Sequence, residues 1–117
     1  MSKADYSIKV KSTTIANFKR HKKIINQNSV FYHKAQANKV SRLGILISKK
    51  AIKLAVIRNL IKRRIIEDFK IKSKKLNNVQ ILMVISNKIY SEKNEISDIL
   101  MQEWTQSIKL LLKPHQQ

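Results

Sequence analysis

The sequence predicts a single α+β domain in which helices pack on a small mixed sheet. A chain of 117 residues suits one domain with a real but small core. Its apolar fraction of 43% is too high for a disordered basic tail. Segments with helical periodicity alternate with short runs of strand formers. The expected order is α-β-β-β-α-β-α.

The N-terminal segment predicts an arm followed by a short helix. Residues 1 to 11 are polar and basic, which favours a flexible basic arm before a single domain at residues 12 to 114 and a tail at 115 to 117. Hydroxyl side chains at 12 to 14 offer N-caps for a helix that ends near residue 22. Ile15 and Phe18 would form its buried edge.

The next segment predicts the first strands. Residues 23 to 35, KKIINQNSVFYHK, contain strand formers bounded by Asn and Gln and indicate one or two strands. In the following RLGILISK, Leu43, Ile45 and Ile47 alternate onto one face of a strand. A glycine at position 44 leaves room for another backbone or a ligand to approach. A simple bulge explains the glycine equally well.

The C-terminal half predicts two helices around one buried strand. The main helix would span 52 to about 74, and the continuous apolar run VQILMVI at 79 to 85 is typical of a strand covered on both faces. Apolar residues spaced by three and four from Ile96 predict a final helix to residue 113, ended by Pro114. Trp104 lies within this stripe and is expected in the core.

Charge indicates the partner. Lys and Arg total 25 against 7 acidic residues, which gives a formal net charge of +18. Such self-repulsion is relieved by a polyanion, so nucleic acid is the expected ligand and an anionic membrane the competing one. No apolar run is long enough for a membrane helix, and no secretory signal is evident. Without cysteine the chain suits a reducing cytoplasm, so a soluble cytoplasmic protein is expected.

The main helix separates apolar from basic residues. On a helical wheel Leu54, Ile57, Ile61 and Ile65 fall within about 80° of one another, and Phe69 lies roughly 40° beyond. An arc of roughly 140° beside this stripe holds Arg58, Asn59, Lys62, Arg63 and Lys70. A solvated helix face usually mixes both charge signs, whereas only Glu67 and Asp68 are acidic in this helix. The arc therefore favours contact with a phosphate backbone.

One family shares this pattern. Lys49-Lys50, Ala55-Val56, Arg58-Asn59, Lys62-Arg63, Glu67 and Phe69-Lys70, preceded by RLGILISKK, resemble the signature of the protein subunit of bacterial ribonuclease P. The resemblance covers roughly residues 12 to 112. It implies a non-catalytic monomer, one per RNA, that helps a catalytic RNA remove the 5′ leader from precursor tRNA. The chemistry would be hydrolysis dependent on Mg²⁺ bound mainly by the RNA.

The resemblance also implies residue roles. The catalytic RNA would contact Lys49, Lys50, Arg58, Asn59, Lys62, Arg63, Arg64 and Lys70. The single-stranded leader would lie in a cleft lined by Phe18, Tyr32 and Ser48, where a base can stack on an aromatic ring. No protein residue is expected to be catalytic or to bind a metal.

Several positions depart from the family pattern. Leu60 replaces an expected Arg and Arg64 an expected apolar residue; these are i,i+4 neighbours, so the exchange keeps the local charge count. Ile66 falls inside the basic arc and, relative to the family pattern, would remove one RNA contact. In the first helix, Thr14 replaces an aromatic residue, and His21 stands where a glycine is usual.

Two other classes of function remain open. Composition fits another basic RNA-binding module, such as a ribosomal or RNA-chaperone protein, equally well. An enzyme with its own nuclease site would need a phosphate cradle around its histidines, which are His21, His33 and His115. Carboxylates such as Glu92, Asp98 and Glu103 are expected to be solvated rather than clustered around metal ions.

Overall fold

The computed structural model describes residue 8 and residues 10–35, 40–76 and 78–112. Its elements are α1 (Ser12–Lys19), β1 (Lys22–Ile25), β2 (Val30–Ala35), β3 (Arg42–Ile47), α2 (Ala55–Lys72), the 3₁₀ turn η2 (Ser73–Lys75), β4 (Val79–Ile85) and α3 (Lys93–Leu112). This order confirms the predicted α-β-β-β-α-β-α arrangement. Residues 23 to 35 form two strands, as one of the two readings predicted.

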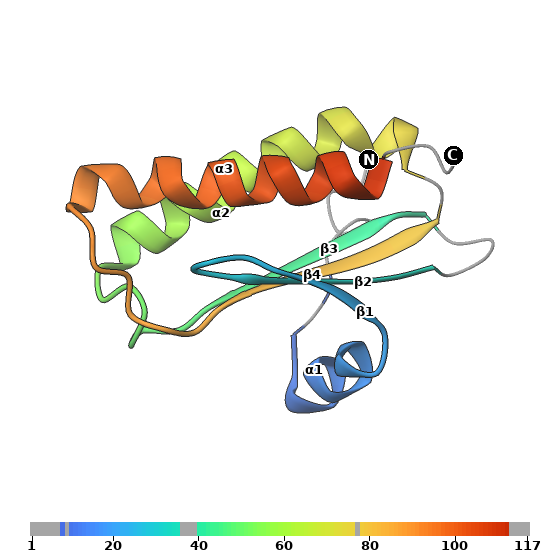
Figure 1. The fold of residues 1–117 in the computed structure, drawn as a ribbon, viewed down its shortest axis with the longest axis horizontal. Coiled ribbons are helices and arrows are strands. Elements are labelled where there is room, and N and C mark those ends of the chain that lie inside the picture. The colour runs from blue at the N-terminus through green and yellow to red at the C-terminus, as the bar shows by residue number, and fades with distance from the viewer. Residues whose placement is uncertain (1–7, 9, 36–39, 77, 113–117) are drawn as a thin grey trace.

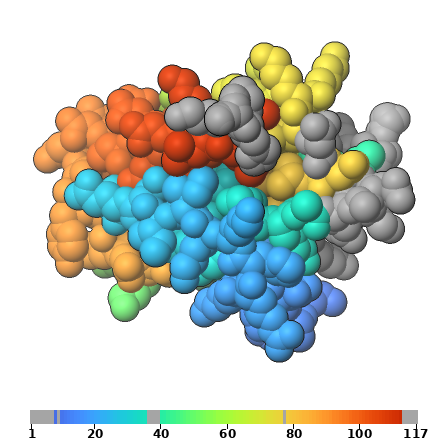
Figure 2. All heavy atoms as spheres, turned by 45° about the vertical axis from the view of Figure 1, so that its right-hand side comes forward, coloured from blue at the N-terminus to red at the C-terminus, as the bar shows by residue number. Residues whose placement is uncertain are grey.

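The four strands form one mixed sheet in the order β1-β2-β4-β3. β2 is antiparallel to both β1 and β4, whereas β3 runs parallel to β4. α2 and α3 cover one face of this sheet, and α1 lies against the other (Figure 1). In the space-filling view α1 forms a separate dark-blue lobe below the strand segments (Figure 2).

The predicted double coverage of β4 is confirmed. Every residue of this strand is buried except Val84, which is partly buried. Ile81 and Met83 face the two long helices and belong to the main core. Leu82 faces the opposite way and forms a smaller cluster with residues of α1 and β2. A continuous apolar run was therefore the correct signal for a strand with no solvated face.

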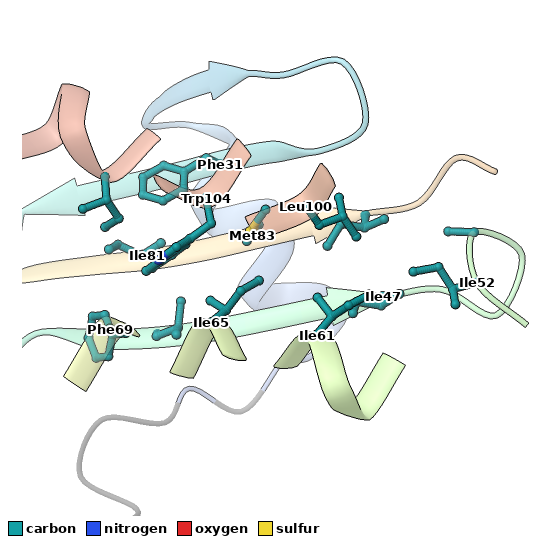
Figure 3. Packing of buried hydrophobic residues seen from close by; sticks show 14 of the residues in the cluster. Phe31, Ile47, Ile52, Ile61, Ile65, Phe69, Ile81, Met83, Leu100 and Trp104 are labelled. Atoms are coloured by element: carbon teal, nitrogen blue, oxygen red, sulfur yellow. The ribbon is translucent and has the colours of Figure 1, made fainter. Parts of the chain in front are cut away.

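The main core lies between the sheet and the two long helices (Figure 3). α2 and α3 contribute fully buried side chains, namely Ile61, Ile65, Phe69, Leu100, Trp104 and Ile108. The Trp104 ring lies 5.6 Å from Phe31 and 6.5 Å from Phe69, measured between centroids. The prediction that Trp104 is a core residue is therefore confirmed.

Gly44 allows the N-terminal segment to approach the sheet. A Cβ atom at this position would lie 3.2 Å from side-chain atoms of Ile8, Val10 and Leu82. The backbone N–H of Ile8 donates a hydrogen bond to the carbonyl oxygen of Leu43 at 3.1 Å. β3 pairs with β4 without interruption, so the bulge interpretation is wrong and close backbone approach is confirmed. Ile8 and Val10 thus contact the domain, although the sequence placed them in the arm; residues 1–7 and 9 lie outside the described part.

The predicted start of α1 was wrong. Its N-cap is Lys11, and no side chain caps the helix. The helix also ends earlier than expected, at Lys19. There the N–H groups of Arg20 and His21 donate to the carbonyls of Asn17 and Phe18, and β1 begins at Lys22. The hydroxyl side chains at 12 to 14 thus do not cap the N-terminus of α1, and the chain leaves the helix at its C-terminus to enter β1.

The start of α2 was also misplaced. The helix begins at Ala55, because residues 48 to 52 form a turn that places Ala51 and Ile52 in the main core. Leu54 is the N-cap and is 46% exposed, so it does not belong to the packed stripe. Ile61, Ile65 and Phe69 are fully buried and the partly buried Ile57 packs against the main core, which confirms the rest of that stripe. α3 starts at Lys93, slightly before Ile96, and Pro114 lies outside the described residues.

Candidate nucleic-acid interface

The basic arc of α2 faces outward. Asn59, Arg63 and Lys70 are exposed, whereas Arg58 and Lys62 are partly buried at the edge of the packed stripe. The buried side of the same helix holds Ile61 and Ile65 on the sheet. We call Asn59, Lys62, Arg63 and Lys70, together with Lys49 and Lys50, the basic surface. Because the apolar stripe of α2 is packed on the sheet, the residues of the basic surface on this helix project from its other side.

Arg58 joins the helix to the loop before it. Its Nη1 donates hydrogen bonds to the carbonyl oxygens of Ile52 at 2.7 Å and Lys53 at 2.8 Å. A guanidinium carries five N–H donors, so these bonds leave donors on Nη2 and Nε for a ligand. Arg58 therefore fixes the loop that carries the exposed Lys49 and Lys50 relative to the helix.

Ser48 anchors the other end of this loop. Its backbone N–H donates to the carbonyl of Ile85 at 3.0 Å, and its hydroxyl donates to the carbonyl of Ser86 at 3.3 Å. The same hydroxyl accepts the N–H of Ala51 at 3.0 Å. The side chain predicted to line the leader cleft thus closes the turn after β3 and ties it to the end of β4.

Arg64 points toward α3 rather than into the basic arc. Its Nη1 lies 2.9 Å from Oδ1 of Asp98 and 2.5 Å from Oγ of Ser97. The positive charge is thus balanced within the protein. The exchange with Leu60 keeps the charge count of the helix, but the cation at position 64 is paired with α3, and Leu60 is 37% exposed. Ile66, expected inside the arc, is partly buried and packs against the main core.

Phe18 and Tyr32 lie in one cluster, but both are buried. Only 2% of Phe18 and 7% of Tyr32 is exposed, and both contact the buried Leu82. The Nζ of Lys34 lies 4.9 Å from the centroid of the Phe18 ring. A base could stack on these rings only if α1 shifted from the sheet.

An open apolar row lies beside this cluster, which sequence patterns did not reveal. The strand register aligns Ile25, Val30, Val84 and Leu46 across the sheet on the face that α1 covers. Ile25 is 70% exposed, and the other three side chains are partly buried. Only the order of the strands brings these residues together. Alternation within a single strand could assign each side chain a face but not a neighbour.

The carboxylates do not all lie in solvent. Glu103 is only 8% exposed and accepts hydrogen bonds from the backbone N–H of Asn28 at 3.0 Å, from its amide at 2.9 Å and from the Ser29 hydroxyl. Our expectation for Glu103 was therefore wrong, because this side chain ties the β1–β2 turn to α3. Asp98 is exposed but paired with Arg64.

The histidines are not brought together in the described structure. His21 is exposed at the end of α1, His33 is partly buried on β2, and His115 lies outside the described residues. Burial lowers the pKa of His33, and the nearby Lys22 lowers it further. Among the residues with a defined placement, no group of three or more His, Asp or Glu could hold a metal ion. No helix in that same part of the chain is long and apolar enough to cross a membrane.

The family model described as Ribonuclease P matches residues 3–111. The chain belongs to this family. It is 36% identical over 110 residues to the ribonuclease P protein component of Clostridium kluyveri, with 92% of each chain covered. The protein component from Coxiella burnetii is 28% identical over 106 residues, which span 86% of this chain and 88% of the relative.

Solved structures agree with this assignment. The RNase P protein of Staphylococcus aureus has a TM-score of 0.65 at 28% identity, with 92% of both chains covered. The Thermotoga maritima RNase P protein has a TM-score of 0.68 at 20% identity, covering 94% of this chain and 98% of that one, and supports the fold alone. The predicted ribonuclease P protein subunit is thus confirmed, with its role in tRNA processing and its association with an RNA subunit.

Proposed function

We propose that this ribonuclease P subunit assists a catalytic RNA that removes the 5′ leader from precursor tRNA, while the protein itself supplies no active site. The observation that carries this role is the basic surface, with cations fixed along one side of α2 and on the loop that Arg58 and Ser48 hold. Neutralising phosphates on a folded RNA would release condensed counterions and supply binding free energy.

The catalytic RNA would dock on the basic surface. Asn59, Lys62, Arg63 and Lys70 lie on α2, and Lys49 and Lys50 precede it in the chain. Arg58 would contribute through its remaining guanidinium donors, because arginine can bind a phosphate in a bidentate manner. Arg64 is left out of this interface, since Asp98 already pairs with it.

The leader would lie on the sheet face that carries α1. Lys34 and the exposed Arg42 lie in one cross-strand row there, and the open apolar row lies on the same face. Phosphates would meet the cations while bases contact the apolar side chains. Phe18 and Tyr32 would stack with a base only after a movement of α1, whereas Ser48 would act by fixing the turn after β3.

The Mg²⁺ ions of the reaction would be bound mainly by the RNA. Such ions activate the attacking water and stabilise the leaving oxygen. The protein would lower the concentration of Mg²⁺ that the RNA requires, because its cations neutralise phosphates that Mg²⁺ would otherwise screen. We place one protein monomer on each RNA, in the cytoplasm where precursor tRNA is processed.

A cleavage assay tests this role. Precursor tRNA is incubated with Mg²⁺ and the protein, with and without the RNA subunit of a bacterial ribonuclease P. We expect cleavage only when the RNA is present, and a lower Mg²⁺ requirement when the protein is added. Cleavage by the protein alone would indicate an intrinsic nuclease. An RNA reaction at low Mg²⁺ that the protein leaves unchanged would favour another kind of RNA-binding module.

A further inference from the structure

A polar hollow lies at the end of the molecule formed by the loops. It is bounded by the β1–β2 turn, by the loop between β4 and α3, and by α3 itself. Its lining includes Gln27, Tyr90, Ile99, Gln102 and Gln106. In Figure 2 the light-blue β1–β2 segment lies directly against the orange part of the chain that includes the start of α3. None of these residues belongs to the basic surface or to the cluster under α1.

Tyr90 gives this hollow an aromatic wall. Its side chain is 84% exposed, whereas the other Phe, Tyr and Trp rings in the described part of the chain, Phe18, Phe31, Tyr32, Phe69 and Trp104, are at most 7% exposed. The preceding Ile89 is buried in the main core, so the backbone that carries Tyr90 is anchored. The Nζ of Lys88 lies 5.5 Å from the ring centroid and brings positive charge to the same rim.

Glutamine amides also line the hollow. Gln102 and Gln106 are exposed one turn apart on α3, and Gln27 is exposed in the β1–β2 turn. These three amides have no hydrogen-bond partner among the described residues, whereas Asn26 and Asn28 donate to Ser107 and Glu103. Each free glutamine amide offers both donors and an acceptor. The partly buried Ile99 adds an apolar surface.

The position of the hollow connects it with the basic surface. β3 and β4 are parallel, so their following loops leave the sheet at the same end, and the β1–β2 turn lies there too (Figure 1). Ser48 binds both the last residue of β4 and the residue after it, which joins the Lys49–Lys50 loop to the loop of Tyr90. A strand of RNA held on Lys49 and Lys50 would therefore lie close to the hollow.

We infer that this hollow binds an unpaired nucleobase of the partner RNA, with the base stacked on Tyr90 and its edge bonded to the glutamine amides. The ring supplies a face suited to any base, and the amides match the mixed donors and acceptors of a base edge. Glu103 also lines the hollow, but its carboxylate is only 8% exposed and its oxygens accept hydrogen bonds from Asn28 and Ser29 within the protein. This inference rests on the proposed function for the identity of the RNA.

Tyr90→Ala tests the stacking, and Tyr90→Phe is the matched control that keeps the ring. Affinity for a fluorescently labelled RNA subunit of bacterial ribonuclease P is measured for both variants and the wild type over a range of salt concentrations. We expect Tyr90→Ala to bind about tenfold more weakly, in the range of base–aromatic stacking. We expect Tyr90→Phe to bind like the wild type, and the slope against salt to stay unchanged in both variants.

The possible outcomes distinguish base stacking in the hollow from a phosphate contact of the kind expected at the basic surface. Wild-type affinity of Tyr90→Ala, or an equal loss in Tyr90→Phe, would overturn base stacking. A loss accompanied by a lower salt slope would overturn it in favour of a phosphate contact. If the wild type binds the RNA subunit no better than an unrelated structured RNA, the proposed function fails and the inference fails with it.

Discussion

The indole N–H of Trp104 donates a hydrogen bond to Oδ2 of Asp68 at 2.7 Å, which joins α3 to α2. Lys72 pairs with the same carboxylate at 2.8 Å, one turn further along α2. Asp68 thus satisfies a buried donor on α3 and a cation on its own helix. The orientation of α2, and with it the direction of its cations, depends on this contact as well as on the apolar stripe.

We expect Asp68→Ala to lower the free energy of unfolding by about 1–3 kcal/mol, because it leaves the buried indole donor without a partner. Glu67→Ala is the matched control, since Glu67 is exposed on the same helix and should change stability by less than about 0.5 kcal/mol. Urea denaturation followed by Trp104 fluorescence measures both variants. Equal stability of the two would show that the hydrogen bond contributes little.

Arg63 and Arg64 are adjacent and chemically identical, which makes them a matched pair for the RNA interface. Arg63 is exposed in the basic arc, whereas Arg64 is paired with Asp98. We expect Arg63→Ala to weaken binding to the catalytic RNA and to reduce the salt slope by roughly one unit, as for one lost phosphate contact. Arg64→Ala should leave that slope unchanged. A salt titration of both variants would contradict the interface if their slopes were the same.

Lys34 tests the face assigned to the leader. We expect Lys34→Ala to weaken binding of precursor tRNA to the protein–RNA complex. Affinity for mature tRNA should stay unchanged, because only the precursor carries the single-stranded 5′ leader. The exposed Lys109 on α3 provides the control variant, Lys109→Ala. Equal losses for precursor and mature tRNA in Lys34→Ala would count against a leader site there. This test is cleaner than removal of the Tyr32 ring, whose burial means that its loss would also cost stability.

Gly44→Val should destabilise the domain by about 1–3 kcal/mol, because the added side chain overpacks a site already in contact with Ile8 and Val10. The same substitution in a chain that lacks residues 1–10 should cost less, since both of those neighbours are then absent. Chemical denaturation of the four proteins in this cycle measures the difference. An equal penalty in both backgrounds would show that Leu82 alone limits the space.

His33 should make stability depend on pH. Its folded-state pKa is lowered by burial and then by Lys22, so the folded state disfavours the charged imidazole. The unfolded chain therefore binds more protons near and below the ordinary histidine pKa. Stability contributed by neutral His33 is present above about pH 6.5 and is lost as the pH falls toward the lowered value. In urea titrations between pH 7.5 and 5, as a rough range around that value, His33→Gln should show a smaller loss of stability than the wild type.

Periodicity predicted the elements well but could not predict their long-range partners. The runs at 42 to 47 and 79 to 85 are strands, because alternation and continuous apolarity are local signals of one-sided and two-sided burial. Glu103 looked solvated because its partners, Asn28 and Ser29, lie far away in the sequence. The ion pair of Arg64 could not be predicted, because nothing in α2 itself reveals Asp98 on another helix.

The N-terminal end of α2 shows a second reason why the sequence did not predict every feature. The wheel assigned Leu54 to the packed stripe, since its spacing from Ile57 and Ile61 fits a helix. The hydroxyl of Ser48 instead stabilises a turn that delivers Ile52 to the core before the helix begins. A local side chain to backbone bond thus competed with helix formation at a position where periodicity alone gave no warning.

The parallel pairing of β3 with β4 makes the basic helix the crossover of a βαβ unit. Both ends of α2 are therefore connected to neighbouring strands of the same sheet, which restrains the position of the helix. Little conformational freedom remains for the protein to lose on this side when it binds. We therefore expect the RNA, rather than this helix, to change conformation when the two bind.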